Sequence, residues 1–410
     1  MDEPRALLEA IYRTALRAVN GRHAVAEALA RPDSGVAAGP LHLIAVGKAA
    51  AAMANGAADV RGDDVVSGLV ITRTGYDDPE LVQRLPVQQL TAPHPVPDER
   101  SLAAGAALVD YLAAAPADAR FLVLISGGAS SLVERLAGKA DPLALSRLNE
   151  WLLASGLDIG RMNAIRKQVS TIKGGRLASW LAGRRADVLL ISDVPGDDPE
   201  VIGSGLLAPP EAGTARPLGL PALPAGIQPA PPPPDPGDPM FRAIRHRVVA
   251  SNAIARVAVE RAAAGHGLPV QLDSELLGGE AVELGTQLAH SLRTGPAGIV
   301  IRGGEPTVTL PPRPGRGGRM QALALSAARV LAGSPCVLLA AGTDGADGPG
   351  EDAGALVDGG TLARGEAAGL MADTALEQAD AGHFLAVSGD LLQTGPTGTN
   401  VMDLVIGLKP

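Results

Sequence analysis

The chain has 410 residues, and this length favours two domains because a single hydrophobic core seldom grows beyond about 250–300 residues. Hydrophobic residues make up 46% of the sequence and aromatic residues only 2%, so aliphatic side chains must fill the cores. The net charge of -9 argues against nucleic acid or an anionic membrane as the main partner, because both bind basic surfaces. The single cysteine, Cys336, excludes an intrachain disulfide and a cysteine-built zinc site. Its apolar neighbours predict that it is buried.

The first 13 residues are charged and lack the apolar region of a signal peptide. No uninterrupted apolar stretch reaches the ~18 residues that a membrane-spanning helix needs. We therefore expect a cytoplasmic protein with no membrane partner. The oligomeric state stays open at this stage, with a homodimer as one alternative.

Short apolar runs that end in small or polar residues recur along the chain. They cover residues 41–47, 68–72, 121–128, 187–194, 247–251, 298–305 and 336–345. Such runs are typical of strands that are buried on both faces of a parallel sheet. Ala- and Leu-rich segments with helical spacing, such as 102–114 and 321–331, lie between them. This alternation predicts an α/β fold, in which ligands bind beyond the carboxyl ends of the strands.

Residues 208–239 interrupt this alternation. The segment is rich in proline, alanine and glycine and contains four consecutive prolines at 231–234, so it fits neither a helix nor a central strand. We interpret it as an extended connector or surface loop. It predicts a boundary between an N-terminal domain, 1–235, and a C-terminal domain, 240–410.

The first apolar run ends in Gly47 and Lys48 and is followed by a helix-like segment. The Lys48 ammonium group would then lie beside a helix N-terminus, where anions bind well. The segment is not a Walker A loop, because His42 and Ala49 stand where that motif needs glycine and serine or threonine. On its own, it fits a surface or capping lysine better.

A glycine- and serine-rich turn follows the run at 121–125. Its candidate ligand-binding residues are Ser126, Gly127, Gly128, Ser130 and Ser131. Two glycines let the backbone approach a ligand closely, and the hydroxyl and N–H groups could bind a phosphate or a carboxylate. An ordinary turn between a strand and a helix explains the segment equally well.

A cationic segment provides a second set of phosphate-binding candidates, Lys173, Gly174, Gly175 and Arg176, shortly after Arg166 and Lys167. Cations that flank a Gly-Gly turn suit a polyphosphate, because they neutralise its charge while N–H groups bind its oxygens. The alternative is a solvated basic helix face.

Three aspartates follow the run that ends near residue 192. Asp193, Asp197 and Asp198 could hold Mg²⁺ or orient a hydroxyl group, although aspartate also favours turns. We favour a functional role for Asp193, which is nearest to the strand, and a turn role for the other two.

Polar residues follow the apolar runs of the C-terminal half in the same way. The candidates are Glu305, Arg319 in a glycine-rich loop, Asp344 in a Gly- and Asp-rich turn, and Thr397 and Asn400 in a hydroxyl-rich turn. Each signal is weak alone.

The order of these motifs resembles the glycerate 2-kinase family, whose members carry a so-called MOFRL C-terminal domain and have also been labelled putative hydroxypyruvate reductases. The motifs are VGKAA, HPVPDERS, SGGASSL, MNAIRKQVSTIKGGRLA, SDVPGDDPEVIGSG, GGEPTVTL, GRGGRMQALAL, AAGTDGADGPGEDAGA and TGPTGTNVMDL. The resemblance covers residues 5–408.

The resemblance implies a Rossmann-like N-terminal domain with a parallel sheet and a smaller C-terminal α/β domain, with the active site in the cleft between them. It also implies transfer of the γ-phosphoryl group of ATP to the 2-hydroxyl of D-glycerate with Mg²⁺. On this basis we expect Lys48, Asp193 and Arg319 to be catalytic, Asp193 and Asp344 to be metal ligands, and the candidates named above to bind substrate or phosphate. The alternative is an NAD(P)H-dependent hydroxypyruvate reductase, but no strand end carries the G-x-G-x-x-G fingerprint that a dinucleotide needs.

Overall fold

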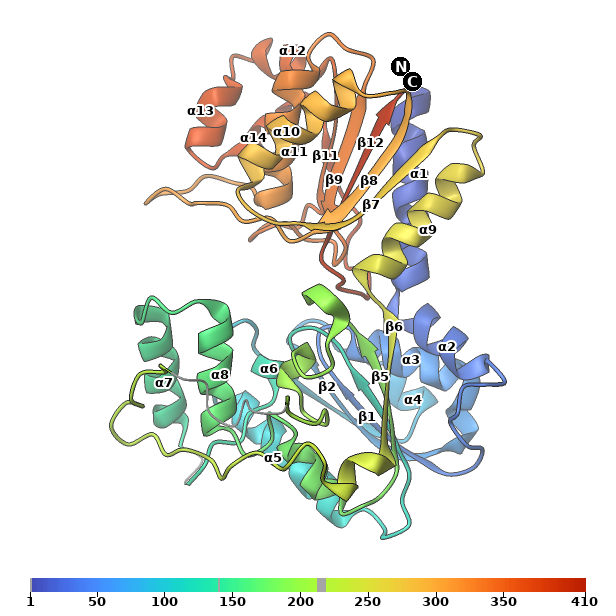
Figure 1. Cartoon of the computed structure of the whole chain (residues 1–410), viewed down its shortest axis with the longest axis vertical. Coiled ribbons are helices and arrows are strands. Elements are labelled where there is room, and N and C mark those ends of the chain that lie inside the picture. The colour runs from blue at the N-terminus through green and yellow to red at the C-terminus, as the bar shows by residue number, and fades with distance from the viewer. Residues whose placement is uncertain (1, 139–140, 212–218) are drawn as a thin grey trace. The chain divides into compact units, whose positions relative to one another are not determined.

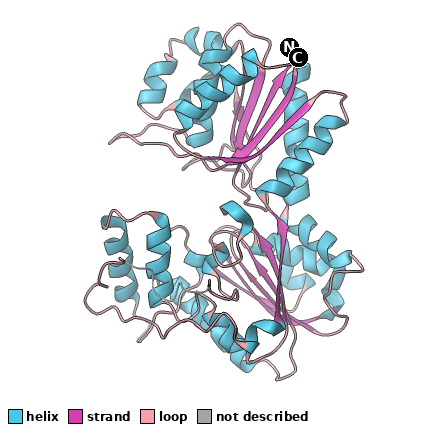
Figure 2. Ribbon diagram, in the orientation of Figure 1, coloured by secondary structure: helices cyan, strands magenta, loops and turns pink. Residues whose placement is uncertain are grey.

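A computed structural model describes residues 2–138, 141–211 and 219–410 of the chain. The chain forms two compact units. Gly21–Val249 form the N-terminal unit, and Ala250–Pro410 form the C-terminal unit together with the N-terminal segment up to Asn20. Figures 1 and 2 show that each unit contains one sheet with helices packed around it. No helix in the described part of the chain is long and apolar enough to cross a membrane.

The sheet of the N-terminal unit has six strands in the order β3-β2-β1-β4-β5-β6. Their bounds are β1 Leu41–Val46, β2 Val65–Arg73, β3 Val87–Ala92, β4 Phe121–Ile125, β5 Ala186–Ile191 and β6 Ile244–Ala250. The pairs β2–β3, β1–β2, β1–β4 and β4–β5 are parallel. The strand order reverses between β1 and β4, and crevices at such switch points are the usual ligand sites of open α/β sheets.

The strands of this sheet form where the sequence has continuous aliphatic runs. Every residue of β4 is buried, and all but one residue of β1 and of β5 are buried as well. The helices of the unit are α2 Gly21–Ala30, α3 Ala50–Arg61, α4 Leu81–Arg84, α5 Glu99–Ala114, α6 Ala129–Leu132, α7 Pro142–Ala154 and α8 Ile159–Val169. Short 3-10 helices occur at η1 Gly62–Asp64, η2 Arg176–Leu181, η3 Pro195–Asp197, η4 Ile202–Ser204 and η5 Pro239–Ala243. Asp98 begins α5 with a capping box that includes Ser101.

The C-terminal unit contains a mixed sheet in the order β11-β10-β9-β12-β8-β7. Its strands are β7 Val270–Leu277, β8 Gly298–Gly304, β9 Val337–Gly342, β10 Gly354–Asp358, β11 Leu391–Leu392 and β12 Asp403–Lys409. Its helices are α1 Asp2–Val19, α9 Asn252–Ala264, α10 Ala281–Thr294, α11 Arg319–Leu331, α12 Thr361–Glu366, α13 Ala372–Glu377 and α14 Ala381–Ser388. The chain end β12 is antiparallel to both β8 and β9. The apolar runs at β8 and β9 are therefore strands as predicted, but their sheet is not all-parallel. Cys336 precedes β9 and is buried, as expected.

The division of the chain differs from the predicted one at 1–235 and 240–410. Helix α1 packs beside α9 and against β9 and β12, and so belongs to the C-terminal unit (Figure 1). The proline-rich segment lies within the N-terminal unit, and its described parts, 208–211 and 219–238, contain neither helix nor strand. Residues 212–218 of this predicted connector lie outside the described residues. The chain passes from one unit to the other between Asn20 and Gly21 and returns between Val249 and Ala250.

Candidate functional site

The turn after β1 and the turn after β4 pack together at the switch point of the N-terminal sheet. Gly47 has φ +135°, and a Cβ there would overlap Ser126 Oγ, so a side chain would not fit. The backbone N–H of Lys48 donates to the Gly127 carbonyl (2.9 Å), and the N–H of Ala49 donates to Ser126 Oγ (3.0 Å). These contacts place the half-buried Lys48 directly before α3.

Three side chains of interest approach the Gly-Gly turn after β4. A Cβ at Gly127 would overlap the carboxylate of Asp193, which follows β5. A Cβ at Gly128 would lie 2.9 Å from His94 Cδ2 and 3.1 Å from Lys48 Cγ. The missing side chains of the two glycines thus leave room for Lys48, His94 and Asp193 around one stretch of backbone. A cation, a carboxylate and an imidazole that meet at a strand end form a plausible reaction centre.

The imidazole of His94 stays neutral near pH 7. Burial, together with the positive charges of Lys48 and Arg73, lowers its pKa from the usual 6.5 to about 4. An unfolded chain therefore binds a proton at His94 more readily than the folded chain does, so stability is lost as pH falls from about 6.5 towards 4. Burial also lowers the pKa of His246 to about 4, with the same sign.

We expect His94→Gln to weaken the acid-induced loss of stability in the N-terminal unit. Both tryptophans of the chain, Trp151 and Trp180, lie in this unit, so their fluorescence in urea reports on it selectively. The urea concentration at half-unfolding should be lower at pH 5 than at pH 7 in the wild type. The decrease should be smaller in the variant, where His246 accounts for the part that remains. Equal decreases in both proteins would contradict the prediction.

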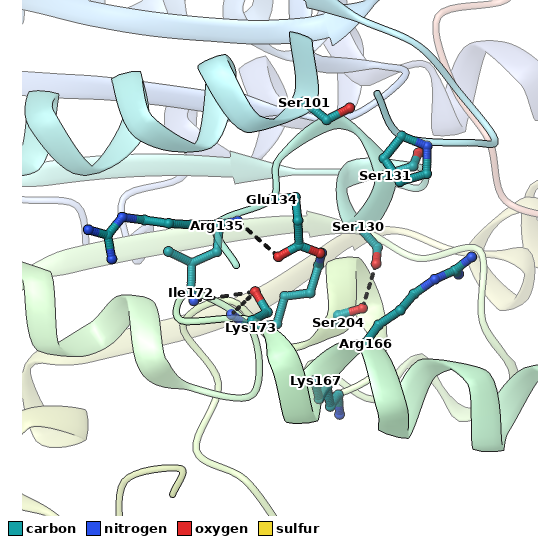
Figure 3. Close-up of polar contacts among 12 residues, drawn as sticks. Ser101, Ser130, Ser131, Glu134, Arg135, Arg166, Lys167, Ile172, Lys173 and Ser204 are labelled. Carbon is teal, nitrogen blue, oxygen red and sulfur yellow. Dashed lines mark hydrogen bonds and ion pairs between the residues drawn. The ribbon is translucent and has the colours of Figure 1, made fainter. Parts of the chain in front are cut away.

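The serine hydroxyls of the predicted turn have mainly internal partners. Ser131 Oγ donates to the Gly128 carbonyl (3.0 Å), and Ser126 Oγ accepts from Ala49. Ser130 Oγ forms a hydrogen bond with Ser204 Oγ (2.7 Å), which follows β5 (Figure 3). The turn is therefore internally braced. The hydrogen bond between Ser130 and Ser204 uses one proton and one lone pair, so the two hydroxyl oxygens keep further lone pairs that a ligand can use.

Lys173, which the sequence predicts to bind phosphate, lies enclosed within the N-terminal unit. Its side chain is 1% exposed and forms an ion pair with Glu134, which is 3% exposed. Glu134 also accepts from the N–H of Arg135 (2.9 Å), as Figure 3 shows. Burial lowers the pKa of Lys173, and Glu134 opposes that shift. Enclosure of the ammonium group favours a structural role for Lys173 over its predicted phosphate-binding role.

The Gly-Gly turn after Lys173 is also internally hydrogen-bonded. The N–H groups of Gly174 and Gly175 donate to the carbonyls of Ser204 (3.0 Å) and Gly205 (2.6 Å). The guanidinium of Arg176 donates to backbone carbonyls, among them that of Pro231 (2.9 Å). These N–H groups already have partners within the protein, and their predicted use for phosphate stays a prediction.

Arg166 is a candidate that the sequence places in a cationic motif without singling it out. It lies on α8 and is half-buried, and its Nη1 donates a long hydrogen bond to Asn163 Oδ1 (3.3 Å). Burial lowers the pKa of Arg166, and the nearby Glu134 carboxylate opposes that shift. Glu134 was not predicted at all, since a single glutamate after a serine turn carries no local signal.

Arg319 begins α11 in the C-terminal unit and is held by two carboxylates. Its Nε donates to Asp403 Oδ2 (2.6 Å), and its Nη1 lies 3.0 Å from Glu305 Oε1. Asp403 is 4% exposed, and burial raises its pKa while Arg319 opposes the shift. The predicted residues Arg319 and Glu305 thus contact each other, and the arginine ties α11 to the ends of β8 and β12.

The other predicted residues of the C-terminal unit lie in turns near the same sheet edge. Asp344 Oδ1 accepts from the N–H of Ala346 (3.1 Å) and would lie 3.4 Å from a Cβ at Gly342. Thr397 Oγ1 donates to the Thr343 carbonyl (2.6 Å). Asn400 follows in the turn that leads to β12. Among the described residues, no group of three or more His, Cys, Asp or Glu side chains is arranged to hold a metal ion.

The two predicted metal ligands do not share a unit. Asp193 belongs to the N-terminal unit and Asp344 to the C-terminal unit. Each is a single carboxylate at a strand end. Such a donor suits Mg²⁺, which keeps several waters and takes one or two carboxylates beside substrate phosphates.

Family models match both halves of the chain. A model described as a domain of unknown function (DUF4147) matches residues 7–220, and the MOFRL family model matches residues 298–403.

Several similar proteins match this chain over most of its length. A protein of Agrobacterium vitis named "Putative hydroxypyruvate reductase" is 38% identical over 88% of this chain and 85% of its own length. The D-glycerate 2-kinase of Thermotoga maritima is 35% identical over 89% of this chain and 90% of its own length. The crystal structure of a glycerate kinase from Thermotoga maritima superposes over 100% of both chains with a TM-score of 0.87 at 31% identity.

Proposed function

Because the chain belongs to the glycerate 2-kinase family, we propose that it transfers the γ-phosphoryl group of ATP to the 2-hydroxyl of D-glycerate. The products are 2-phosphoglycerate and ADP. One observation carries the assignment of residues: Lys48 and Asp193 come from the ends of different strands and both approach the Gly127-Gly128 backbone. A cation and a carboxylate at one strand edge are what a phosphoryl transfer to a hydroxyl needs.

In this proposal Lys48 stabilises the charge that develops on the γ-phosphoryl oxygens. Phosphoryl transfer needs little covalent help from the protein, so positioning and charge compensation account for most of the rate. The hydroxyl oxygen forms the new bond to phosphorus while the bond to the ADP oxygen breaks. Asp193 accepts the hydroxyl proton or orients the hydroxyl group. The catalytic role of Arg319 stays a prediction, and Glu305 and Asp403 compensate its charge.

Mg²⁺ would supply charge neutralisation on the phosphates of the donor. Asp193 and Asp344 are each a carboxylate at a strand end, a donor type that suits such an ion, and the role of each as a metal ligand stays a prediction. A cytoplasmic location, a homodimer and substrate contacts by Thr397 and Asn400 also stay predictions.

Asp193→Asn should lower kcat by about 10²–10⁴-fold, because the amide cannot accept the hydroxyl proton. The KM for D-glycerate should change little, since the side chain keeps its shape. Steady-state kinetics with a coupled ADP assay measure both constants. Asp197→Asn is the matched control: Asp197 has φ +54°, which asparagine also adopts readily, and its activity should equal that of the wild type. Equal activity in both variants would remove Asp193 from the mechanism.

The proposed function is tested by incubating the protein with ATP, Mg²⁺ and D-glycerate and identifying the product by phosphorus NMR. 2-Phosphoglycerate is expected, and 3-phosphoglycerate would refute the assigned regiochemistry. A parallel reaction with NADH and hydroxypyruvate, without ATP, examines the activity named in the Agrobacterium vitis relative. Turnover there, and none with ATP, would replace the kinase proposal by a reductase.

A further inference from the structure

A cavity of about 560 Å³ lies in the N-terminal unit between α8 and the proline-rich segment. One face of α8 lines it with Gly160, Ala164 and Lys167, which the helical repeat places above one another. Pro229, Ala230, Pro232 and Pro233 of the proline-rich segment also line it. The volume falls within the ~300–1,000 Å³ of small-molecule sites in proteins. Gly174 and Arg176, two of the phosphate-binding candidates from the sequence, also line the cavity.

The walls of the cavity are fixed by hydrogen bonds. The N–H of Ala230 donates to the Gln168 carbonyl (2.8 Å), and Arg176 Nε donates to the Pro231 carbonyl (2.9 Å). Prolines on this wall have restricted φ angles and lack an N–H donor. Pro229, Ala230, Pro232 and Pro233 of the expected connector therefore form an apolar wall of restricted conformation, and such a wall binds a ligand at a smaller entropic cost.

The charges on the walls are already compensated. Lys167 Nζ lies 3.1 Å from Glu200 Oε1, and both side chains line the cavity. The guanidinium of Arg176 is occupied by backbone carbonyls. A polyphosphate would gain little from such a lining. The cavity is better suited to a flat, uncharged ring that packs against the prolines and has a few polar groups at its edge.

Two carboxamides supply those polar groups. Asn163 and Gln168 both line the cavity from α8. Gln168 Oε1 is buried, and it has no hydrogen-bond partner among the residues that the structure describes. A buried acceptor without a hydrogen bond destabilises the folded protein. An amino group of a ligand that donates to Gln168 Oε1 would remove this unfavourable free energy. Carboxamides pair well with the edge of a purine, because each offers a donor and an acceptor.

Ser204 connects the lining of the cavity to the turn of the candidate reaction centre. This residue lines the cavity, and its Oγ contacts Ser130 Oγ at 2.7 Å. Ser130 lies two residues after Gly128, where Lys48 and His94 approach. A ligand whose ring lies in the cavity could therefore extend a phosphate chain past Ser204 to Lys48.

We infer that this cavity binds the nucleoside end of the phosphoryl donor, with a purine ring between α8 and the proline wall. The inference rests on the proposed kinase function and adds to it the place of donor recognition. It also explains why Lys167 and Arg176, although they belong to a cationic motif, are paired with protein groups: they build the wall of a site for an uncharged ring.

Ala164→Trp tests the inference, because the indole fills the cavity from the α8 side. Binding of ADP to the full chain is measured by isothermal titration calorimetry. We expect the Kd for ADP to rise at least tenfold, while the KM for D-glycerate stays near that of the wild type. Leu153→Trp is the matched control: Leu153 is 70% exposed on α7, so the same bulk is added outside the cavity and the Kd should not change.

The outcomes separate this inference from the proposed function. Equal Kd values for Ala164→Trp and Leu153→Trp, in an enzyme that still phosphorylates glycerate, would overturn the cavity assignment alone. A wild type that binds ADP but phosphorylates no glycerate would overturn the proposed function alone.

Photolabelling with 2-azido-ADP uses the wild-type protein, so this test does not depend on whether a variant folds. Peptide mapping should find the label within 160–168 or 229–233, since these segments form the walls. Labelling confined to other segments would overturn the inference.

Discussion

Replacement of Lys48 by methionine should lower kcat by about 10²–10³-fold, the usual loss when one preorganised charge-stabilising group is removed. Methionine keeps most of the side-chain length and the apolar stem. The backbone contacts that place residue 48, between its N–H and Gly127 and between Ala49 and Ser126, do not involve the ammonium group. The variant should therefore fold normally and still bind ADP. Steady-state kinetics and thermal melting measure the two properties.

Arg147→Met is the control for this loss of charge. Arg147 is exposed on α7, so its removal changes the net charge by the same amount without touching the candidate site. Its kcat should equal that of the wild type. A Lys48→Met enzyme with near-normal turnover would mean that the cation at the switch point takes no part in the transfer.

The strands of the N-terminal sheet could be predicted because each is a continuous apolar run. The runs at β1, β4 and β5 stand out since burial on both faces leaves no polar alternation. The residues that follow them, among them Lys48 and Asp193, come together because parallel strands end at the same edge of a sheet. Local sequence is sufficient for this part of the candidate site.

The contacts that the sequence could not predict join segments far apart in the chain. Lys173 follows a cationic run and resembles a phosphate ligand, but Glu134, 39 residues earlier, encloses its charge. The proline-rich segment resembles a linker in composition, whereas its backbone bonds to α8 and Arg176 make it a wall. Helix α1 carries no signal for the strands near the C-terminus against which it packs. Composition and spacing report local conformation, and these features depend on tertiary partners.

Replacement of Lys173 by methionine should destabilise the N-terminal unit by about 3–5 kcal/mol, because removal of one partner leaves the other charge buried and uncompensated. Glu134 is 3% exposed and, among the described residues, would keep the hydrogen bond from the N–H of Arg135 but lose its ion pair. Urea unfolding followed by the fluorescence of Trp151 and Trp180 measures the loss in this unit.

The double variant Lys173→Met with Glu134→Leu separates a structural role from a ligand-binding role. Removal of both charges leaves apolar side chains in an apolar enclosure, and such replacements of buried ion pairs are often neutral or stabilising. We therefore expect the double variant to regain most of the stability that the single variant loses, with a KM for ATP close to that of the wild type. If Lys173 instead bound phosphate, the double variant would recover stability and still show a strongly raised KM for ATP. The burial of the Lys173–Glu134 pair predicts the first result, because a charge that no solvent reaches can act on a ligand only through the fold that it supports.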